Sequence, residues 1–211
     1  MRTSHRDRRG FTLATLCAAL IITCIIPSVG ALNVTYVVLP NATHYLTTMD
    51  INDTSEFQFT NSDIIGENIP VSVTNVTLTA ENGTPVNYNW TTQWGSTDEI
   101  TFDKGNYTIS YISPLENNQI QESFDIPYNV SVYLAEPYDV RNPLLAGLSS
   151  GADIIRTPEN TTIVKWNQTV SFDLRFYDKA REDLLYLFGE FMIILAVLLL
   201  IPFFLMQRPP E

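Results

Sequence analysis

The stretch Asn75–Thr92, NVTLTAENGTPVNYNWTT, sets the pattern of the middle of this 211-residue chain. Apolar side chains alternate with polar ones on both sides of Asn82-Gly83, a dipeptide typical of turns between strands. The alternation predicts a β-hairpin with one apolar face and a loop of three or five residues. The predicted pairs are Val76 with Trp90, Leu78 with Tyr88 and Ala80 with Val86.

Similar alternation over most of residues 32–177 predicts many short strands. The apolar sets are Val34, Tyr36 and Val38; Val71 and Val73; Tyr107, Ile109 and Tyr111; Val130, Val132 and Leu134; and Val170, Phe172, Leu174 and Phe176. Turns are predicted at Pro40-Asn41, Asn82-Gly83, Lys104-Gly105, Pro114, Pro127 and Pro158. The sequence therefore predicts an all-β fold of one or two antiparallel immunoglobulin-like β-sandwiches.

The best domain boundary in this β region is the segment 114–121, PLENNQIQ. It separates a first sandwich over residues 32–113 from a second sandwich over residues 122–178. A continuation of the first sandwich through residue 178 is the alternative.

A short motif supports the sandwich prediction. Asp103-Lys104-Gly105-Asn106-Tyr107 resembles the Asp-x-Gly-x-Tyr signature of immunoglobulin-like domains, in which the tyrosine hydroxyl bonds to backbone upstream. Ile109 stands where antibody domains carry a cysteine, so no disulfide is expected here.

Residues 1–31 have the organisation of a signal peptide. Four arginines precede the apolar run Phe11–Ile26, and Ser28–Ala31 supplies the small residues that a signal peptidase requires. An uncleaved anchor is the alternative, although the run is short for a bilayer span. Both cysteines, Cys17 and Cys24, lie in this run, so no disulfide can brace the β region.

A second apolar run, Leu184–Met206, predicts a transmembrane helix about 35 Å long. Glu190 is expected near its outer end, where lipid head groups reach it. The Lys/Arg bias places residues 207–211 in the cytoplasm as a short stub and the β region outside. The expected location is therefore the cell membrane, crossed once.

The β region is acidic. Residues 32–183 contain 20 Asp and Glu but only 7 Lys and Arg, a net charge of −13. Such a surface repels phosphates and offers no basic patch, so no nucleic-acid partner is expected.

Ten Asn-x-Ser/Thr triplets lie between the two apolar runs, where chance would give about three. They begin at Asn33, Asn41, Asn52, Asn75, Asn82, Asn89, Asn106, Asn129, Asn160 and Asn167. Within strands an outward Asn requires an inward middle residue, and Val34, Val76, Trp90, Tyr107 and Val130 suit a core. We expect N-glycosylation sites, with lower occupancy where Trp90 or Asp53 follows the Asn. The alternative is that Asn and Thr are merely common on outward strand faces.

Catalytic constellations are missing from the sequence. A serine triad would need His44, the only histidine in the β region, and no metal-binding or phosphate-binding motif occurs. We therefore expect no enzyme activity, no cofactor and no small-molecule substrate. Asp50–Asp53 with Glu56 resembles part of a cadherin-like calcium site, and Trp94 could form a sugar platform; both are minor alternatives.

The segment Asn142–Gly151, NPLLAGLSSG, breaks the strand alternation. We expect a loop that covers the core edge, with packing on the membrane or on a partner as the alternative.

The whole layout resembles an uncharacterised archaeal family of membrane-anchored surface proteins. The features that carry the resemblance are the export signal, Asn142–Gly147, Val164-Lys165-Trp166 and Phe176-Tyr177-Asp178. The resemblance implies no activity and no functional residues.

Two main functions remain as expectations. The first is a non-catalytic, single-pass cell-surface glycoprotein with a structural or adhesive role in the envelope. The second is an accessory subunit or extracytoplasmic sensor, which docks on an integral membrane partner through the helix and the Asn142–Gly151 loop. An extracellular hydrolase ranks last, because the chain offers so few candidate bases.

Overall fold

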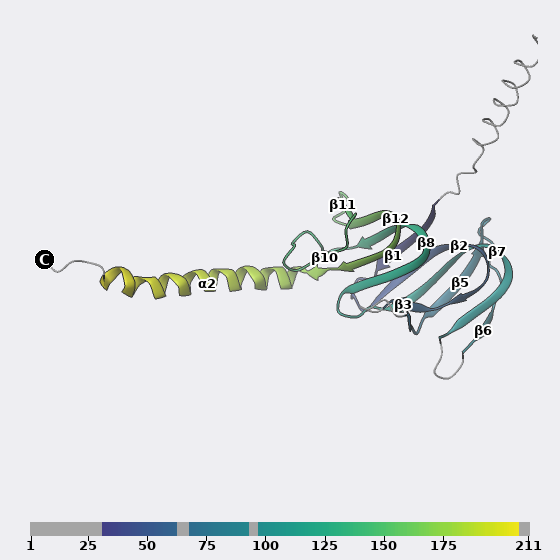
Figure 1. The fold of residues 1–211 in the computed structure, drawn as a ribbon, viewed down its shortest axis with the longest axis horizontal. Helices are drawn as coiled ribbons and strands as arrows, with labels where there is room; N and C mark the ends of the chain where they lie inside the picture. Colours follow the sequence, from purple (N-terminus) through teal and green to yellow (C-terminus); the bar gives the residue numbers. More distant parts are fainter. Residues whose placement is uncertain (1–30, 63–67, 93–96, 207–211) are drawn as a thin grey trace, which may run out of the picture. The chain divides into compact units, whose positions relative to one another are not determined.

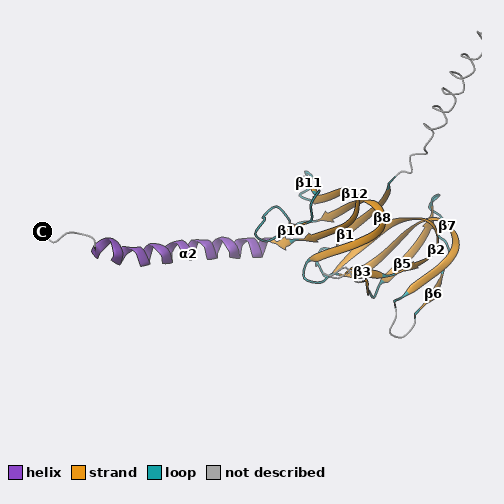
Figure 2. Cartoon of the chain, viewed as in Figure 1, coloured by secondary structure: helices purple, strands orange, loops and turns teal. Residues whose placement is uncertain are grey.

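Thirteen strands and one long helix make up the described part of the chain (Figures 1 and 2). The computed structural model describes residues 31–62, 68–92 and 97–206. The chain divides into two units, residues 1–30 and Ala31–Glu211. The predicted signal peptide, the stub 207–211 and Trp94 lie outside the described residues.

The elements follow one another in a simple order. Their bounds are β1 Leu32–Val38, β2 His44–Gln58, β3 Thr60–Ser62, β4 Asn68–Pro70, β5 Thr74–Ala80, β6 Asn89–Thr91, β7 Glu99–Pro114, β8 Gln119–Leu134, β9 Tyr138–Asp139, β10 Gly147–Leu148, β11 Asp153–Arg156, β12 Thr162–Arg175, β13 Tyr177–Asp178 and α2 Lys179–Met206.

Nine strands form one sheet in the order β10-β12-β8-β1-β2-β7-β5, with β11 beside β12 and β6 beside β7. β1 runs parallel to β8, whereas the other pairs of this sheet are antiparallel. The sheet is therefore mixed, which corrects the prediction of purely antiparallel strands. The pairs β13-β9 and β3-β4 form two small separate sheets.

Strands from both sides of the predicted domain boundary share this sheet, because Val34 of β1 lies opposite Val130 of β8. The segment 114–121 covers the end of β7, the connection 115–118 and the start of β8. Leu115 and Ile120 within it are buried in one core cluster, together with residues of β1, β8 and β12. A second cluster gathers residues of β2, β5 and β7 around Phe59.

The longest strands are interrupted by register shifts. In the pair β12-β8 the register shifts fall between Trp166 and Ser171, and Val170 lies in this irregular stretch, outside the regular pairing with β8. Phe172 and Leu174 resume the phase of Val164 and Trp166 and are buried, whereas Val170 is 51% exposed. The prediction of one continuous apolar face through Val170 was wrong for this reason.

Two predicted turns lie inside strands instead. Lys104-Gly105 falls within β7, at a point where the pairing with β2 shifts register. Pro127 falls within β8, between Ser123 and Tyr128, which pair with β12. Pro127 itself has no partner in that register, so its lack of an N–H group costs no hydrogen bond between the strands.

The hairpin of residues 75–92 has a three-residue loop, one of the two predicted lengths, whereas the predicted pairs correspond to a five-residue loop. The amide of Ala80 donates to the Thr84 carbonyl (2.9 Å), and Thr79 lies opposite Pro85. Leu78 therefore faces Val86, two positions away from the predicted partner Tyr88.

Trp90 is not a core residue, contrary to the prediction. β6 pairs with β7, where Trp90 lies opposite Ile100, rather than with β5. The indole stacks on Phe59 (ring centroids 5.3 Å apart) and remains 41% exposed.

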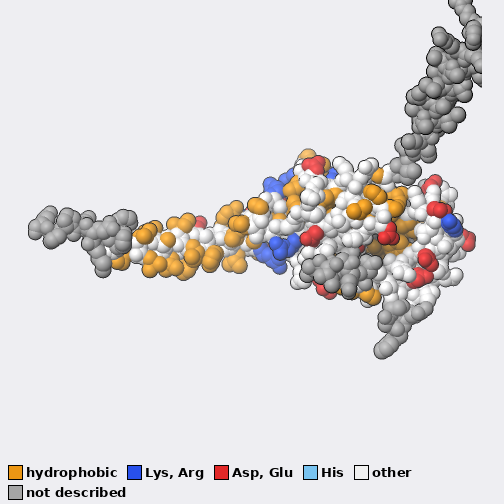
Figure 3. All heavy atoms as spheres, in the orientation of Figure 1, with side chains coloured by type: hydrophobic (Ala, Val, Ile, Leu, Met, Phe, Trp, Pro, Cys, Tyr) orange, Lys and Arg blue, Asp and Glu red, His pale blue; other side chains and the backbone are white. Residues whose placement is uncertain are grey.

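The helix α2 begins at a capping residue, because the carboxylate of Asp178 accepts a hydrogen bond from the amide of Arg181 (2.8 Å). Its segment Lys179–Pro202 is long and apolar enough to cross a membrane, and none of that span is buried. Apolar side chains line its visible face (Figure 3). The helix contains the predicted span 184–206 and starts five residues before it.

Candidate functional site

The ten predicted glycosylation asparagines lie mostly at the surface. Nine are exposed, and Asn129 is half-buried. Of the middle residues, Val34 and Val130 are buried as expected, Val76 and Tyr107 are half-buried, and Trp90 is exposed.

Two of these asparagines occupy turns. The side-chain oxygens of Asn41 and Asn82 accept hydrogen bonds from the amides of Thr43 (3.2 Å) and Thr84 (3.0 Å). This Asx-turn geometry engages the carbonyl oxygen only. It leaves the amide Nδ2, the atom to which an N-linked glycan attaches, outside the turn hydrogen bonds.

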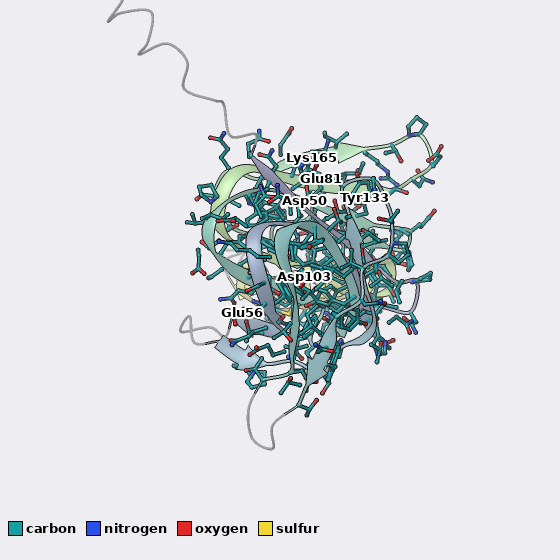
Figure 4. All side chains as sticks on the ribbon, turned by 90° about the vertical axis from the view of Figure 1, so that its right-hand side faces the viewer. Asp50, Glu56, Glu81, Asp103, Tyr133 and Lys165 are labelled. Atoms are coloured by element: carbon teal, nitrogen blue, oxygen red, sulfur yellow. The ribbon has the colours of Figure 1, made fainter. Side chains whose placement is uncertain are left out.

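Other asparagines use Nδ2 as a donor. Nδ2 of Asn129 donates to Oδ1 of Asn33 (3.4 Å), and Nδ2 of Asn33 donates to Asp50 (3.3 Å). Nδ2 of Asn106 donates to Glu81 (3.3 Å). Asp50 and Glu81 both lie in the upper part of Figure 4. A glycan at these sites would have to displace the hydrogen bonds.

The remaining five triplets begin at Asn52, Asn75, Asn89, Asn160 and Asn167. Asn52 lies near Asn106, because the amide of the next residue, Asp53, donates to Oδ1 of Asn106 (3.0 Å). Asn82 also lies near Asn106, because both side chains line one open surface hollow. Nδ2 of Asn160 donates to Glu136 (3.4 Å), close to the start of α2. Asn75, Asn89 and Asn167 occupy exposed positions of strands β5, β6 and β12.

The acidic segment Asp50–Asp53 does not form a ligand set. Asp50 accepts hydrogen bonds from Asn33 and from Thr108 (3.0 Å), whereas Asp53 pairs with Lys104 (3.1 Å). Over the described ranges no three His, Cys, Asp or Glu side chains converge to hold a metal ion. His44 is exposed, and its ring Nδ1 shares a hydrogen bond with the hydroxyl of Thr43 (2.8 Å).

A groove that the sequence reasoning missed lies between the register shift of β2 and the bend of β8, with a volume of about 330 Å³. Aromatic side chains form much of its lining, and three carboxyl groups contribute to it. These residues are Tyr36, Phe57, Tyr111, Phe124 and Tyr128, with Glu56, Glu122 and Asp125.

Glu122 is the unusual group in this groove, because it is only 8% exposed. The amide of Asn61 donates from Nδ2 to Oε1 of Glu122 (2.8 Å) and accepts from the Tyr45 hydroxyl (3.1 Å), the orientation that satisfies both neighbours. Its position could have been noticed in the sequence: Ile120, Glu122 and Phe124 share one phase of the alternation, so a Glu occupies an inward position.

Burial controls the ionisation of this cluster. Desolvation raises the pKa of Glu122 from its ordinary value of 4.5 to about 8. Desolvation also raises the pKa of Tyr128 to about 12 and those of Tyr36, Tyr45 and Tyr111 well above their usual range, with the nearby Glu122 charge contributing for the last three. The tyrosines therefore stay neutral when Glu122 titrates.

A smaller hollow of about 200 Å³ lies beside β9 and the start of α2. Two of its three cations form ion pairs: Nε of Arg141 lies 2.9 Å from Oδ2 of Asp139, and Nζ of Lys179 lies 3.1 Å from Asp183. The third, Arg156, donates a hydrogen bond to Oδ1 of Asn160 (3.2 Å). Burial raises the pKa of Asp139, but hydrogen bonds from the Arg141 side chain and from backbone amides outweigh it and lower that pKa overall.

The loop that begins at Asn142 is tied to the residues before α2. Its Asn142 amide donates to the hydroxyl of Tyr177 (3.1 Å), and Ala146 is buried in the first core cluster. Leu144, by contrast, is 77% exposed. The loop thus covers the core edge and also presents the apolar side chain of Leu144 to the surroundings.

A comparison with curated proteins gives no match. A family model described as a family of unknown function (DUF5803) matches residues 31–208, which include the whole β region and α2. The matched part contains the motifs at Asn142–Gly147, Val164–Trp166 and Phe176–Asp178 that carried the resemblance. The chain therefore belongs to this family of unknown function, DUF5803.

Proposed function

We propose that the protein is a non-catalytic, single-pass surface glycoprotein, whose β region lies outside the cell membrane on the helix α2. The observation that carries the proposal is the set of ten Asn-x-Ser/Thr triplets, all within the β region and nine with an exposed Asn. Its role would be structural or adhesive, and glycans and negative charge would keep the surface soluble.

The charge distribution supports contact between the membrane surface and the end of the β region that leads into α2. Six of the seven Lys and Arg residues between Leu32 and Asp183 lie in the segment 141–181, while residues 32–135 contain Lys104 alone. On the visible face, most Lys and Arg side chains gather where the β region leads into α2 (Figure 3). Basic residues beside a membrane span favour contact with anionic head groups.

An immunoglobulin-like relationship is part of the proposal. It rests on the Asp103–Tyr107 motif, in which the Tyr107 hydroxyl donates to the carbonyl of Asp103 (2.9 Å). A bond of this kind between a tyrosine hydroxyl and upstream backbone is characteristic of such sandwiches.

Labelling of intact cells tests the outside location. The three lysines of the chain, Lys104, Lys165 and Lys179, all precede the predicted span Leu184–Met206, and the Lys104 side chain is 63% exposed. A membrane-impermeant amine reagent is expected to modify Lys104 on intact cells. Modification of Lys104 only after lysis would place the β region inside and refute the orientation.

A second candidate function has one specific observation in its favour. The exposed Leu144, in a loop bonded to Tyr177 just before α2, offers an apolar contact to an integral membrane partner. If the protein is an accessory subunit, a stoichiometric partner is expected to co-purify after solubilisation, and Leu144→Ser should weaken that association. The matched control is Ile126→Ser, which changes an exposed apolar residue of β8 in the same way. Leu39→Ser would be unsuitable, because the Leu39 side chain is partly covered.

A further inference from the structure

The groove between β2 and β8 combines aromatic walls with negative charge. Tyr36, Tyr111 and Tyr128 present rings to it, and Phe57 and Phe124 extend the same lining. Glu56 and Asp125 stand at its exposed parts, and Glu122 lies at its buried part. Among the described lining residues none is Lys, Arg or His.

Burial of the Glu122 side chain lowers the stability of the folded protein. A buried carboxylate loses its hydration, and the single hydrogen bond from Asn61 restores only part of it. An apolar residue would continue the alternation of Ile120 and Phe124 and fill the core at lower cost. A ligand of opposite charge would make an ionised Glu122 favourable.

We propose that this groove binds a small organic cation with a substituted ammonium head group, held between the tyrosine rings and the Glu122 carboxylate. The faces of aromatic rings attract such cations, which shed water more readily than a metal ion or a primary ammonium group. The carboxylates of Glu56 and Asp125 raise the local concentration of cations at the entrance. This inference does not depend on glycosylation.

Binding and proton release are coupled at this site. The free groove holds Glu122 protonated at neutral pH, since desolvation raises its pKa to about 8, and the cation selects the ionised form. The titratable groups that face Glu122 are Tyr36 of β1, Tyr45 of β2, Tyr111 of β7 and Tyr128 of β8, with Glu56 and Asp125 toward solvent. Because the tyrosines stay neutral, affinity for a permanent cation should rise about tenfold between pH 7 and pH 9.

Choline is a suitable probe, because its charge does not change with pH. The purified full chain in dodecyl maltoside, which carries no choline group, is dialysed to equilibrium against radiolabelled choline at pH 7 and pH 9. The neutral analogue 3,3-dimethyl-1-butanol, which has nearly the same shape, serves as the competitor. We expect saturable choline binding that the analogue displaces poorly.

Variants separate the role of the charge from that of the fold. Glu122→Gln keeps an acceptor for Asn61 and should lower choline affinity at least about tenfold and abolish the pH dependence. Asp125→Asn, at an exposed position, should lower it by about two- to threefold without disturbing the core. Glu116→Gln, exposed and outside the groove, should leave it unchanged. Absence of saturable binding, or equal binding of the neutral analogue, would overturn the proposal.

Discussion

The ring of Tyr107 leaves no room for a side chain at Gly105. A Cβ atom at Gly105 would lie 2.8 Å from the Tyr107 hydroxyl oxygen and 3.0 Å from two ring carbons. The same hydroxyl donates to the carbonyl of Asp103, so the ring cannot move away without losing this hydrogen bond. The spacing Asp-x-Gly-x-Tyr predicted the bond, and the structure adds the reason for the glycine.

Gly105→Ala should therefore destabilise the protein by about 1–3 kcal/mol, because the added methyl group forces the ring and the backbone apart. Urea unfolding of the purified chain measures the change. Gly147→Ala is the matched control, since a Cβ there would meet Arg175 at an ordinary 3.6 Å. Equal effects of the two substitutions would contradict the proposed close contact.

Glu122 should make stability depend on pH. The unfolded chain loses this proton near the ordinary value of 4.5, whereas the folded protein keeps it up to about 8. Between these values the folded state binds more protons, so the free energy of unfolding falls as the pH rises and levels off above about 8. The slope is at most about 1.4 kcal/mol per pH unit.

Glu122→Gln should remove this decline, and Glu116→Gln should retain it. Urea unfolding between pH 5 and pH 9 checks both expectations. A decline of the same slope in Glu122→Gln would show that other groups cause it.

At the scale of elements, the strands could be predicted better than their faces. The alternation of apolar and polar residues located β1, β5 and the second half of β8, because in those segments every second residue faces the core without interruption. It failed at β12, where residues between Trp166 and Ser171 shift the register. Val170 shares the phase of the buried Trp166 and Phe172, and a bulge has no fixed composition, so the exposure of Val170 could not be derived from spacing.

Truncation of two neighbouring apolar residues tests the shift in β12. Phe172→Ala should cost about 3–5 kcal/mol of unfolding free energy, because Phe172 is buried beside Tyr36 and Trp166. Val170→Ala should cost less than about 0.5 kcal/mol at its exposed position. Comparable costs in urea unfolding would mean that both side chains face the core.

The hairpin of residues 75–92 shows a second limit. The odd loop length followed from the apolar pattern, but registers that differ by two residues keep every side chain on the same face. Local pattern therefore could not distinguish Leu78 opposite Tyr88 from Leu78 opposite Val86. The pairing of β6 with β7 decides the outcome, and that contact is distant in sequence.

At the scale of the whole molecule, the sequence predicted a β region followed by one apolar helix, and the structure has both. The parallel pairing of β1 with β8 joins residues about 100 positions apart, so no local pattern indicates it. The groove around Glu122 arises from the bends of two long strands that are not neighbours in the sheet. Glu122 could be noticed in the sequence, whereas its aromatic surroundings could not.

Glycopeptide mass spectrometry of the native protein tests the central claim most directly. The account predicts hexose-containing modifications on several of the ten asparagines, with higher occupancy at the turn sites Asn41 and Asn82. Lower occupancy is expected at Asn129, which is half-buried and donates its Nδ2 to Asn33. Unmodified asparagine at all ten positions, in peptides recovered from native membranes, would contradict the proposed surface glycoprotein.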